Sequence, residues 1–269
     1  MPCAPDHPAD LAALRRAFEA RRPLDWGDKP LAADEIARRY GPKAAGKSLE
    51  LLRRTAEIEP RVTAQFLASI PTGSSPYQLS RRVKSPESLA RKLRTWSDAN
   101  NRNPVEDLLR YTVLTESADE LVASARSTTE ALTDRGWRVL YAMHSYTDGS
   151  RYKGIHVHFG TPDIDRLEVQ WHSVRSAEVK ELTTRWYEVE RSLTTSDDER
   201  TAARQKCVEA SAQLRTPPGI DALTQLGGRR VKVNNYSDSR QMVTNRRPTA
   251  TGHRRRPGTD RDRGEGIAR

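Results

Sequence analysis

Hydrophobic positions recur along most of this chain at the spacing of amphipathic helices, and the shorter stretches between them have the pattern of strands. The helical spacing covers residues 10–22, 32–40, 43–57, 61–70, 86–96, 117–135 and 197–214, and a long helix before the last of these carries Val179, Leu182, Trp186, Val189 and Leu193 on one side. The stretches 105–115, 137–144, 152–159 and 165–172 alternate between apolar and polar positions or are rich in β-branched residues, which is typical of strands.

The order of these elements predicts an α+β fold, in which a mixed sheet of four to five strands is flanked by helices. We expect residues 1–75 to form a helical N-terminal extension, residues 76–227 to form the sheet domain with its C-terminal helices, and residues 228–269 to form a disordered basic tail. The turn-rich sequence PTGSSP at 71–76 marks the first boundary. The tail is predicted to be disordered because it has no apolar periodicity and many turn-forming residues.

The positive charge of the chain is concentrated at its C-terminal end. The 269 residues carry a formal net charge of +10, and residues 228–269, with 12 Lys or Arg against 4 Asp or Glu, account for +8 of it. The rest of the chain is nearly neutral. The tail is therefore where an RNA such as tRNA, or another acidic partner, would bind; the alternative is that it only keeps the chain solvated.

The remaining composition favours a soluble cytoplasmic protein. Cys3 and Cys207 lie far apart and form no disulfide or zinc-ligand pattern, which indicates a reducing compartment. The N-terminal sequence lacks the apolar core of a signal peptide, and no stretch approaches the length of a membrane span, so we expect no membrane partner.

Cations and hydroxyl groups gather where the predicted helix over 86–96 begins. Ser85 suits the N-cap and Pro86 the first helical position, which leaves spare N–H donors at the open end of the helix. Ser88 and Lys92 lie one turn apart on one face. We expect this helix start to bind a polyphosphate through Arg82, Lys84, Ser85, Ser88 and Lys92. The alternative is an ordinary capped surface helix.

Two carboxylates lie downstream, and the first of them, Asp107, is placed to reach a metal ion. Asp107 lies at the entrance of the strand over 105–115, and Glu168 lies on the polar side of the alternating sequence LEVQWH. Between them, Tyr152 is expected to open a strand in which Gly154 allows close approach and His156 faces the polar side. A polar side on a short strand is also typical of a solvated sheet surface, which is the alternative for Glu168.

Four segments resemble, in this order, the synthetase domain of the RelA/SpoT family. They are RVKSPESLARK, EDLLRYTV, YKGIH and LEVQWHS, and the later VKELTTRWYEVER extends the likeness to a divergent branch of that family. The resemblance implies a nucleotidyltransferase-like synthetase fold. It also implies an alarmone synthetase that moves the β,γ-pyrophosphate of ATP to the 3′-hydroxyl of an acceptor, either a guanosine or an adenosine nucleotide.

The resemblance also assigns roles to residues of this chain. Asp107 and Glu168 are the implied catalytic residues and Mg²⁺ ligands, and Glu168 is also the implied general base. Tyr152 is implied to stack on the acceptor base, with His156 and Gln170 as further acceptor contacts. The implied ATP-binding residues are Arg82, Lys84, Ser85, Ser88, Lys92 and Arg110.

The chain departs from the family pattern at two places. The family usually carries an arginine five residues after the metal-binding aspartate, and here that position is Thr112; Arg110 shares its strand face and is expected to supply a similar charge. The family's lysine-containing loop before the tyrosine is replaced by HSYTDGSR at 144–151. Two alternatives therefore stay open: a toxin that pyrophosphorylates the 3′ end of tRNA, and a catalytically inactive nucleotide-binding or interaction module.

Two further motifs favour other classes of protein. The sequence GPKAAGKS at 41–48 fits the P-loop pattern, but the residues before it have a charged helical pattern where a P-loop requires a buried strand. His156, His158 and His172 would form a zinc site if neighbouring strands brought them together, although no cysteine supports them. We expect neither site to form.

Overall fold

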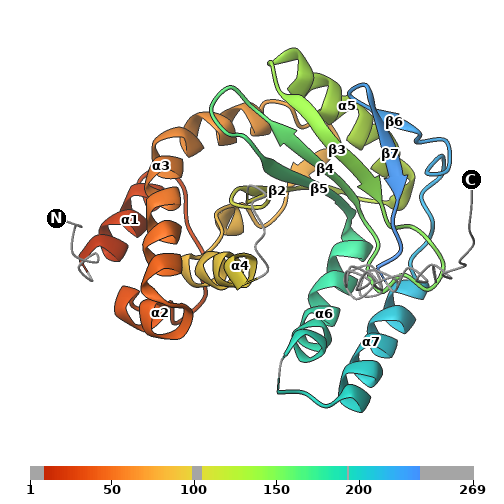
Figure 1. Cartoon of the computed structure of the whole chain (residues 1–269). Helices are drawn as coiled ribbons and strands as arrows, with labels where there is room; N and C mark the ends of the chain where they lie inside the picture. Colours follow the sequence, from red (N-terminus) through yellow and green to blue (C-terminus); the bar gives the residue numbers. More distant parts are fainter. Residues whose placement is uncertain (1–8, 99–104, 193, 237–269) are drawn as a thin grey trace, which may run out of the picture. The chain divides into compact units, whose positions relative to one another are not determined.

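The structure is a computed structural model that describes residues 9–98, 105–192 and 194–236 (Figure 1). The α-helices are α1 (Ala9–Glu19), α2 (Ala33–Tyr40), α3 (Pro42–Leu67), α4 (Pro86–Asp98), α5 (Leu121–Asp134), α6 (Val174–Arg191) and α7 (Asp197–Ala212). The strands are β1 (Ser74–Pro76), β2 (Arg110–Thr115), β3 (Arg138–His144), β4 (Ile155–Gly160), β5 (Leu167–Ser173), β6 (Gln225–Leu226) and β7 (Arg229–Val233). Short 3₁₀ turns at Leu79–Arg81 and Ala118–Glu120 precede α4 and α5.

The strands form one mixed sheet in the order β1-β2-β5-β4-β3-β7-β6. The pairs β2–β5 and β3–β7 are parallel, and the other neighbours are antiparallel. The predicted α+β class with a mixed sheet is confirmed, but the sheet has seven strands where four to five were predicted. The additional strands β1, β6 and β7 are short and carry few apolar residues, so they lack the periodic signal of the central strands.

One face of the sheet is apolar and is covered by α3 and α5. Leu167, Val169 and Trp171 of β5 point to this face and are fully buried. On the neighbouring strand, the Tyr111 ring stacks on Phe66 of α3 with ring centroids 4.5 Å apart. Helix α5 packs against β5 on this same face of the sheet (Figure 1). The strict alternation of LEVQWH thus sends its polar residues to the opposite face, where the candidate site is found.

A buried ion pair joins the N-terminal helices to the sheet domain. The Arg82 guanidinium donates to Glu59 of α3, with Nε 2.6 Å from Oε1, and also to the backbone carbonyls of Phe18, Pro23 and Leu79. Both side chains are almost inaccessible to solvent. Residues from before and after the predicted boundary at 75 share one hydrophobic core, so the N-terminal helices pack on the sheet domain.

The prediction that disorder begins at residue 228 is wrong for the segment up to Tyr236. Strand β7 pairs with β3 in the register Ala142↔Val231, and Val231 is buried in the core. The turn into β7 needs glycine, since Gly227 has a φ of 50° and an added Cβ would lie 2.3 Å from Cγ2 of Val139. Arg229, Arg230 and Lys232 are exposed around the single buried valine, which is why the strand resembles a basic tail. Residues 237–269 of the predicted tail lie outside the described residues.

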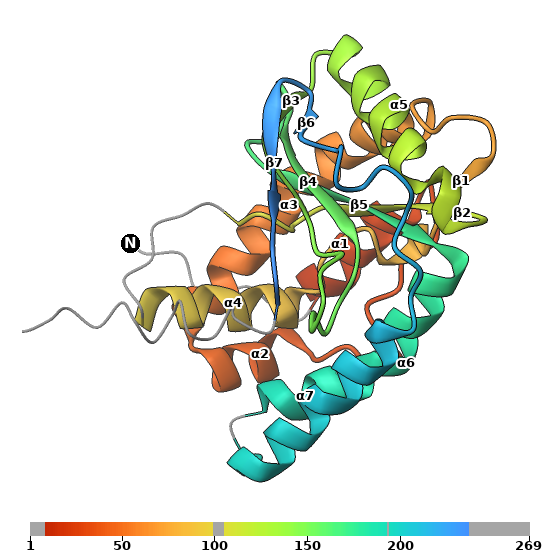
Figure 2. The ribbon, with the colours of Figure 1, turned by 90° about the vertical axis from the view of Figure 1, so that its right-hand side faces the viewer.

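Two other local predictions differ from the structure. Tyr152 does not open a strand, because β4 begins at Ile155. The predicted apolar side of α6 is only partly buried: Val179 is buried, but Leu182 and Val189 are 49% and 39% exposed. Helix α6 packs against α7 along its length instead, as the two views show (Figures 1 and 2). Leu193 lies outside the described residues. Within the described part of the chain, no helix combines the length and apolar character needed to cross a membrane.

Candidate active site on the polar face of the sheet

The register of three strands brings polar side chains into rows on one face of the sheet. Arg110 of β2 is opposite Glu168 of β5, and Glu168 is opposite His158 of β4. The next row holds Thr112, Gln170 and His156 in the same way. Residues opposite each other in a ladder share a face, so Arg110, Glu168, Gln170 and His156 are neighbours, as the predicted site requires.

Glu168 is held as an anion by its neighbours on this face. His156 Nδ1 donates to Glu168 Oε1 at 2.7 Å, and both side chains are nearly buried. Burial alone would raise the pKa of the Glu168 carboxyl, but the hydrogen bond and charge of His156, together with the charges of Arg110 and His158, lower it well below its usual range. A carboxylate with so low a pKa suits the binding of a cation better than the acceptance of a proton.

Asp107 lies between two lysines, Lys84 just before α4 and Lys92 within that helix. Lys84 Nζ is 2.7 Å from Asp107 Oδ2, and Lys92 Nζ is 2.7 Å from Asp107 Oδ1. Burial would raise the pKa of Asp107, and the two lysine charges outweigh it and lower the pKa. Burial also lowers the pKa of Lys84, against the attraction of Asp107. The lysines that were predicted to bind polyphosphate are thus paired with the predicted metal ligand.

The helix start has the predicted cap. Ser85 Oγ accepts a hydrogen bond from the Ser88 backbone N–H at 3.2 Å, and Pro86 is the first residue of α4. The N-cap prediction for Ser85 is confirmed by this contact, whereas binding of phosphate by Ser85 and Ser88 stays a prediction. Arg82 does not belong to this group, because its guanidinium is turned into the core toward Glu59. We therefore remove Arg82 from the phosphate-binding set.

The two carboxylate regions are connected through the backbone of β2 and β5. The Glu168 N–H donates to the carbonyl of Leu109 at 3.0 Å, and Leu109 follows Asp107 by two residues. Asp107 and Glu168 are therefore at the same end of the parallel pair β2–β5. The described residues contain no cluster of three or more His, Cys, Asp or Glu side chains placed to hold a metal ion, so the three histidines His156, His158 and His172 do not form such a cluster.

Tyr152 lies above the histidine row and is held by His172. The His172 ring is buried, and this burial, with Lys180 nearby, keeps its pKa well below the usual value, so the ring is neutral. The Ser176 hydroxyl donates to the Ser173 carbonyl and lies 3.0 Å from His172 Nδ1, which makes Nδ1 the donor. His172 Nε2 then accepts from the Tyr152 hydroxyl at 2.7 Å.

Gly154 makes the close approach of Tyr152 to the sheet possible. A Cβ on Gly154 would lie 2.8 Å from the Tyr152 hydroxyl oxygen and 2.9 Å from His172 Cε1. Any larger residue at position 154 would push the Tyr152 ring away from His172 of β5. Gly154 was predicted to allow close approach of a ligand or of the backbone; in the structure the groups that approach it are the side chains of Tyr152 and His172.

The structure adds Lys180 and Tyr236 to the polar face. Lys180 of α6 donates from Nζ to Gln170 Oε1 at 3.1 Å, and burial, with Arg110 nearby, lowers its pKa to about 8. The Tyr236 ring contacts the rings of Tyr152 and His156. Lys180 lies within a strongly charged helical stretch, and Tyr236 lies within the predicted tail, so neither residue was assigned to the site from the sequence.

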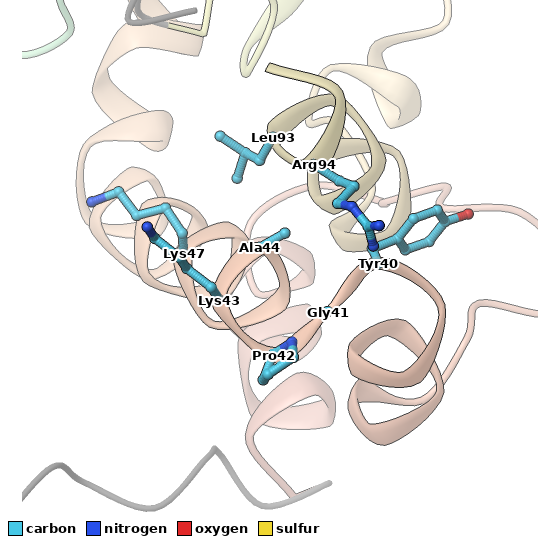
Figure 3. A pocket seen from close by; sticks show the side chains of 8 residues that line it. All are labelled: Tyr40, Gly41, Pro42, Lys43, Ala44, Lys47, Leu93 and Arg94. Atoms are coloured by element: carbon cyan, nitrogen blue, oxygen red, sulfur yellow. The ribbon is translucent and has the colours of Figure 1, made fainter. Parts of the chain in front are cut away.

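The P-loop-like segment forms a helix and not a phosphate-binding loop. Residues 42–48 are the first turns of α3, and the element before them is helix α2. Lys47 pairs with Glu50, and Ser48 Oγ donates to the Ala45 carbonyl. A cavity of about 320 Å³ lies beside this segment, between the start of α3 and the C-terminal half of α4 (Figure 3). Its lining consists of Tyr40, Gly41, Pro42, Lys43, Ala44, Lys47, Leu93 and Arg94. A P-loop requires a strand, a loop and then a helix, so this interpretation is rejected.

Comparison with known proteins finds solved structures that are similar to the chain at low identity. No family model and no curated protein matches the chain. The chain is similar to small alarmone synthetase 2 from Bacillus subtilis at 14% identity, over 61% of this chain and 89% of that one, with a TM-score of 0.43. It is similar to the Type VI effector Tas1, solved with its immunity protein, at 19% identity over 64% and 95%, with a TM-score of 0.39.

A third similar structure is a GTP pyrophosphokinase family protein from Streptococcus pneumoniae, at 14% identity over 67% of this chain and 87% of that one, with a TM-score of 0.37. Because the TM-scores are below 0.5, these similarities establish neither substrate nor activity for this chain.

Proposed function

We propose that the chain is a RelA/SpoT-type pyrophosphokinase that transfers the β,γ-pyrophosphate of ATP to the 3′-hydroxyl of a guanosine or adenosine nucleotide. The observation that carries this proposal is the pairing of Asp107 with Lys84 and Lys92 beside the Glu168–His156 pair, at one end of β2 and β5. This arrangement joins a cationic helix start, which suits polyphosphate, to two carboxylates with lowered pKa values, which suit a divalent cation.

In the proposed reaction the acceptor 3′-oxygen bonds to the β-phosphorus of ATP. The bond from that phosphorus to the oxygen of the α-phosphate breaks, and AMP leaves with this oxygen. Lys84, Ser85, Ser88, Lys92 and Arg110 would bind the phosphates of ATP. Tyr152 would stack on the acceptor base, and His156 and Gln170 would contact the acceptor. Glu168, the general base that the resemblance implies, would accept the proton of the 3′-hydroxyl.

The residues present fit a magnesium ion. Mg²⁺ prefers oxygen ligands and keeps several waters, and Asp107 and Glu168 are carboxylates that the structure holds ionised. These two residues would hold the ion, which would neutralise charge on the ATP phosphates. Lys84 and Lys92 share the Asp107 carboxylate in this structure. A phosphate that binds the two lysines would therefore free the carboxylate oxygens of Asp107 to bind the ion.

The proposal is tested by incubating the full chain with γ-labelled ATP, Mg²⁺ and, in turn, GDP, GTP, AMP, ADP and bulk tRNA. We expect release of AMP and transfer of the label to a free nucleotide, because Tyr152 and both carboxylates lie in the sheet domain and not in residues 237–269. Transfer to tRNA alone would make the tRNA-modifying toxin the correct alternative. No AMP with any acceptor would leave an inactive binding module.

Replacing Lys84 by Ala is expected to weaken ATP binding by about 1.5–3 kcal/mol, since a charge-assisted contact to phosphate is lost. Lys47→Ala is the matched control, because Lys47 belongs to the P-loop-like helix start and pairs with Glu50 at the surface. Titration of both variants with ATP by calorimetry gives the two affinities. Weaker ATP binding by Lys47→Ala, together with unchanged ATP binding by Lys84→Ala, would contradict the proposed ATP site and favour the P-loop interpretation.

A further inference from the structure

The segment after β7 is fixed to the loop that leads to Tyr152. The Asn234 N–H donates to the His144 carbonyl at 2.9 Å, and Asn235 Nδ2 donates to the Asp148 carbonyl at 2.9 Å. The Tyr236 N–H lies 3.5 Å from Ser150 Oγ, and that hydroxyl donates to the Tyr152 carbonyl at 2.7 Å. The segment 234–236 therefore runs beside the loop and brings the Tyr236 side chain over the polar face.

The Tyr236 ring lies against the Tyr152 ring. Their centroids are 5.4 Å apart with an angle of 86° between the planes, and the His156 ring is 6.5 Å from Tyr236. Burial raises the pKa of Tyr236, and the negative charge of Glu168 raises it further. An edge-to-face pair of this spacing is an attractive contact.

Tyr236 is the neighbour of Tyr152 that can leave without disturbing the sheet. The Tyr152 ring also contacts His156 at 5.2 Å and His172 at 5.5 Å, but these residues belong to β4 and β5, which are paired with strands on both sides. Tyr236 follows the last residue of β7, Val233, by three positions. A base that stacked on Tyr152 from this side would take the place of the Tyr236 ring.

We propose that Tyr236 occupies the position of the acceptor base on Tyr152 and so limits acceptor binding; this inference rests on the proposed role of Tyr152. Replacement of the Tyr236 ring by a nucleotide base on Tyr152 is favourable when nucleotide is present. An aromatic pair of this kind changes an equilibrium constant by about 2- to 10-fold, and stacking of a base by about 5- to 150-fold. Tyr236 therefore discriminates against acceptors that stack weakly, such as pyrimidines, without blocking purines.

The test compares the full chain with Tyr236→Ala, Tyr236→Phe and Val233→Ala. Binding of GDP, GTP, AMP and ADP is measured by calorimetry, and the acceptor KM and the KM for ATP are measured in the labelled-ATP assay. We expect Tyr236→Ala to bind the acceptor about 2- to 10-fold more tightly and to lower its KM by the same factor, with the KM for ATP unchanged. Tyr236→Phe keeps the ring and should resemble the wild type. Val233→Ala is the control on the same segment, since Val233 is 64% exposed.

Three results would overturn the inference. Weaker acceptor binding in Tyr236→Ala would show that this ring forms part of the acceptor site, and equal binding would show that the ring contact has no effect. Failure of every nucleotide to bind Tyr236→Ala would overturn both this inference and the proposed function. Tighter nucleotide binding in Tyr236→Ala with no AMP formed by any variant would overturn the proposed function alone.

Discussion

Replacement of Glu168 by Gln is expected to lower the rate of pyrophosphate transfer at least about 100-fold while the fold stays intact. The amide has the shape of the carboxylate but no charge, so it binds a divalent cation poorly and cannot accept a proton. It also removes the anion that His156 and Arg110 face. The initial rate of AMP release under saturating ATP and acceptor measures the effect.

The matched control for Glu168→Gln is Glu106→Gln. Glu106 lies next to Asp107 at the same end of β2, but its side chain is 41% exposed and pairs with Arg166 at the surface. The same loss of charge there should leave the rate nearly unchanged. Thermal unfolding of both variants checks that the fold is retained. A Glu168→Gln protein with a rate near that of the wild type would remove Glu168 from the proposed site.

Replacement of Glu59 by Ala is expected to destabilise the fold by about 3–5 kcal/mol, the largest loss of stability that we predict for a single charged residue. The substitution leaves the Arg82 guanidinium buried without its carboxylate partner, although its bonds to the carbonyls of Phe18, Pro23 and Leu79 remain. The free energy of unfolding from urea titration measures the effect.

Glu50→Ala is the control for Glu59→Ala, because Glu50 is on the same helix and pairs with Lys47 and Arg54 at the surface. Exposed pairs of this kind contribute about 0–1 kcal/mol, so the control should unfold at nearly the wild-type urea concentration. Equal losses in the two variants would contradict a special role for the buried pair.

The central strands and the site on their polar face were predictable because their signal is local. The alternation in LEVQWH fixes which residues share a face, and the capping residues Ser85 and Pro86 mark where α4 begins. Once Arg110 and Glu168 are on adjacent strands, their common face follows from the pleat. The pairing of Asp107 with Lys84 and Lys92 was not itself predicted, although all three residues were assigned to the site.

The parts that sequence reasoning missed depend on contacts between distant residues. Arg82 has the same local context as Lys84, and only the arrival of Glu59 from α3 turns it into the core. Lys180 is one charge among many on α6 until Gln170 accepts its hydrogen bond. Strand β7 contains a single buried valine, so its pairing with β3 is determined by the partner strand and not by its own periodicity.

The late position of β7 in the chain has a consequence for synthesis on the ribosome. The strand next to it, β3, ends about 85 residues before β7 begins, and β4, β5, α6, α7 and β6 are made in that interval. During that interval a nascent chain exposes β3 as an open edge, which is a surface for pairing with other chains. Among the described strands, β7 is the last to emerge and therefore protects the newly made protein from aggregation, and the same step places Tyr236 over the polar face of the sheet.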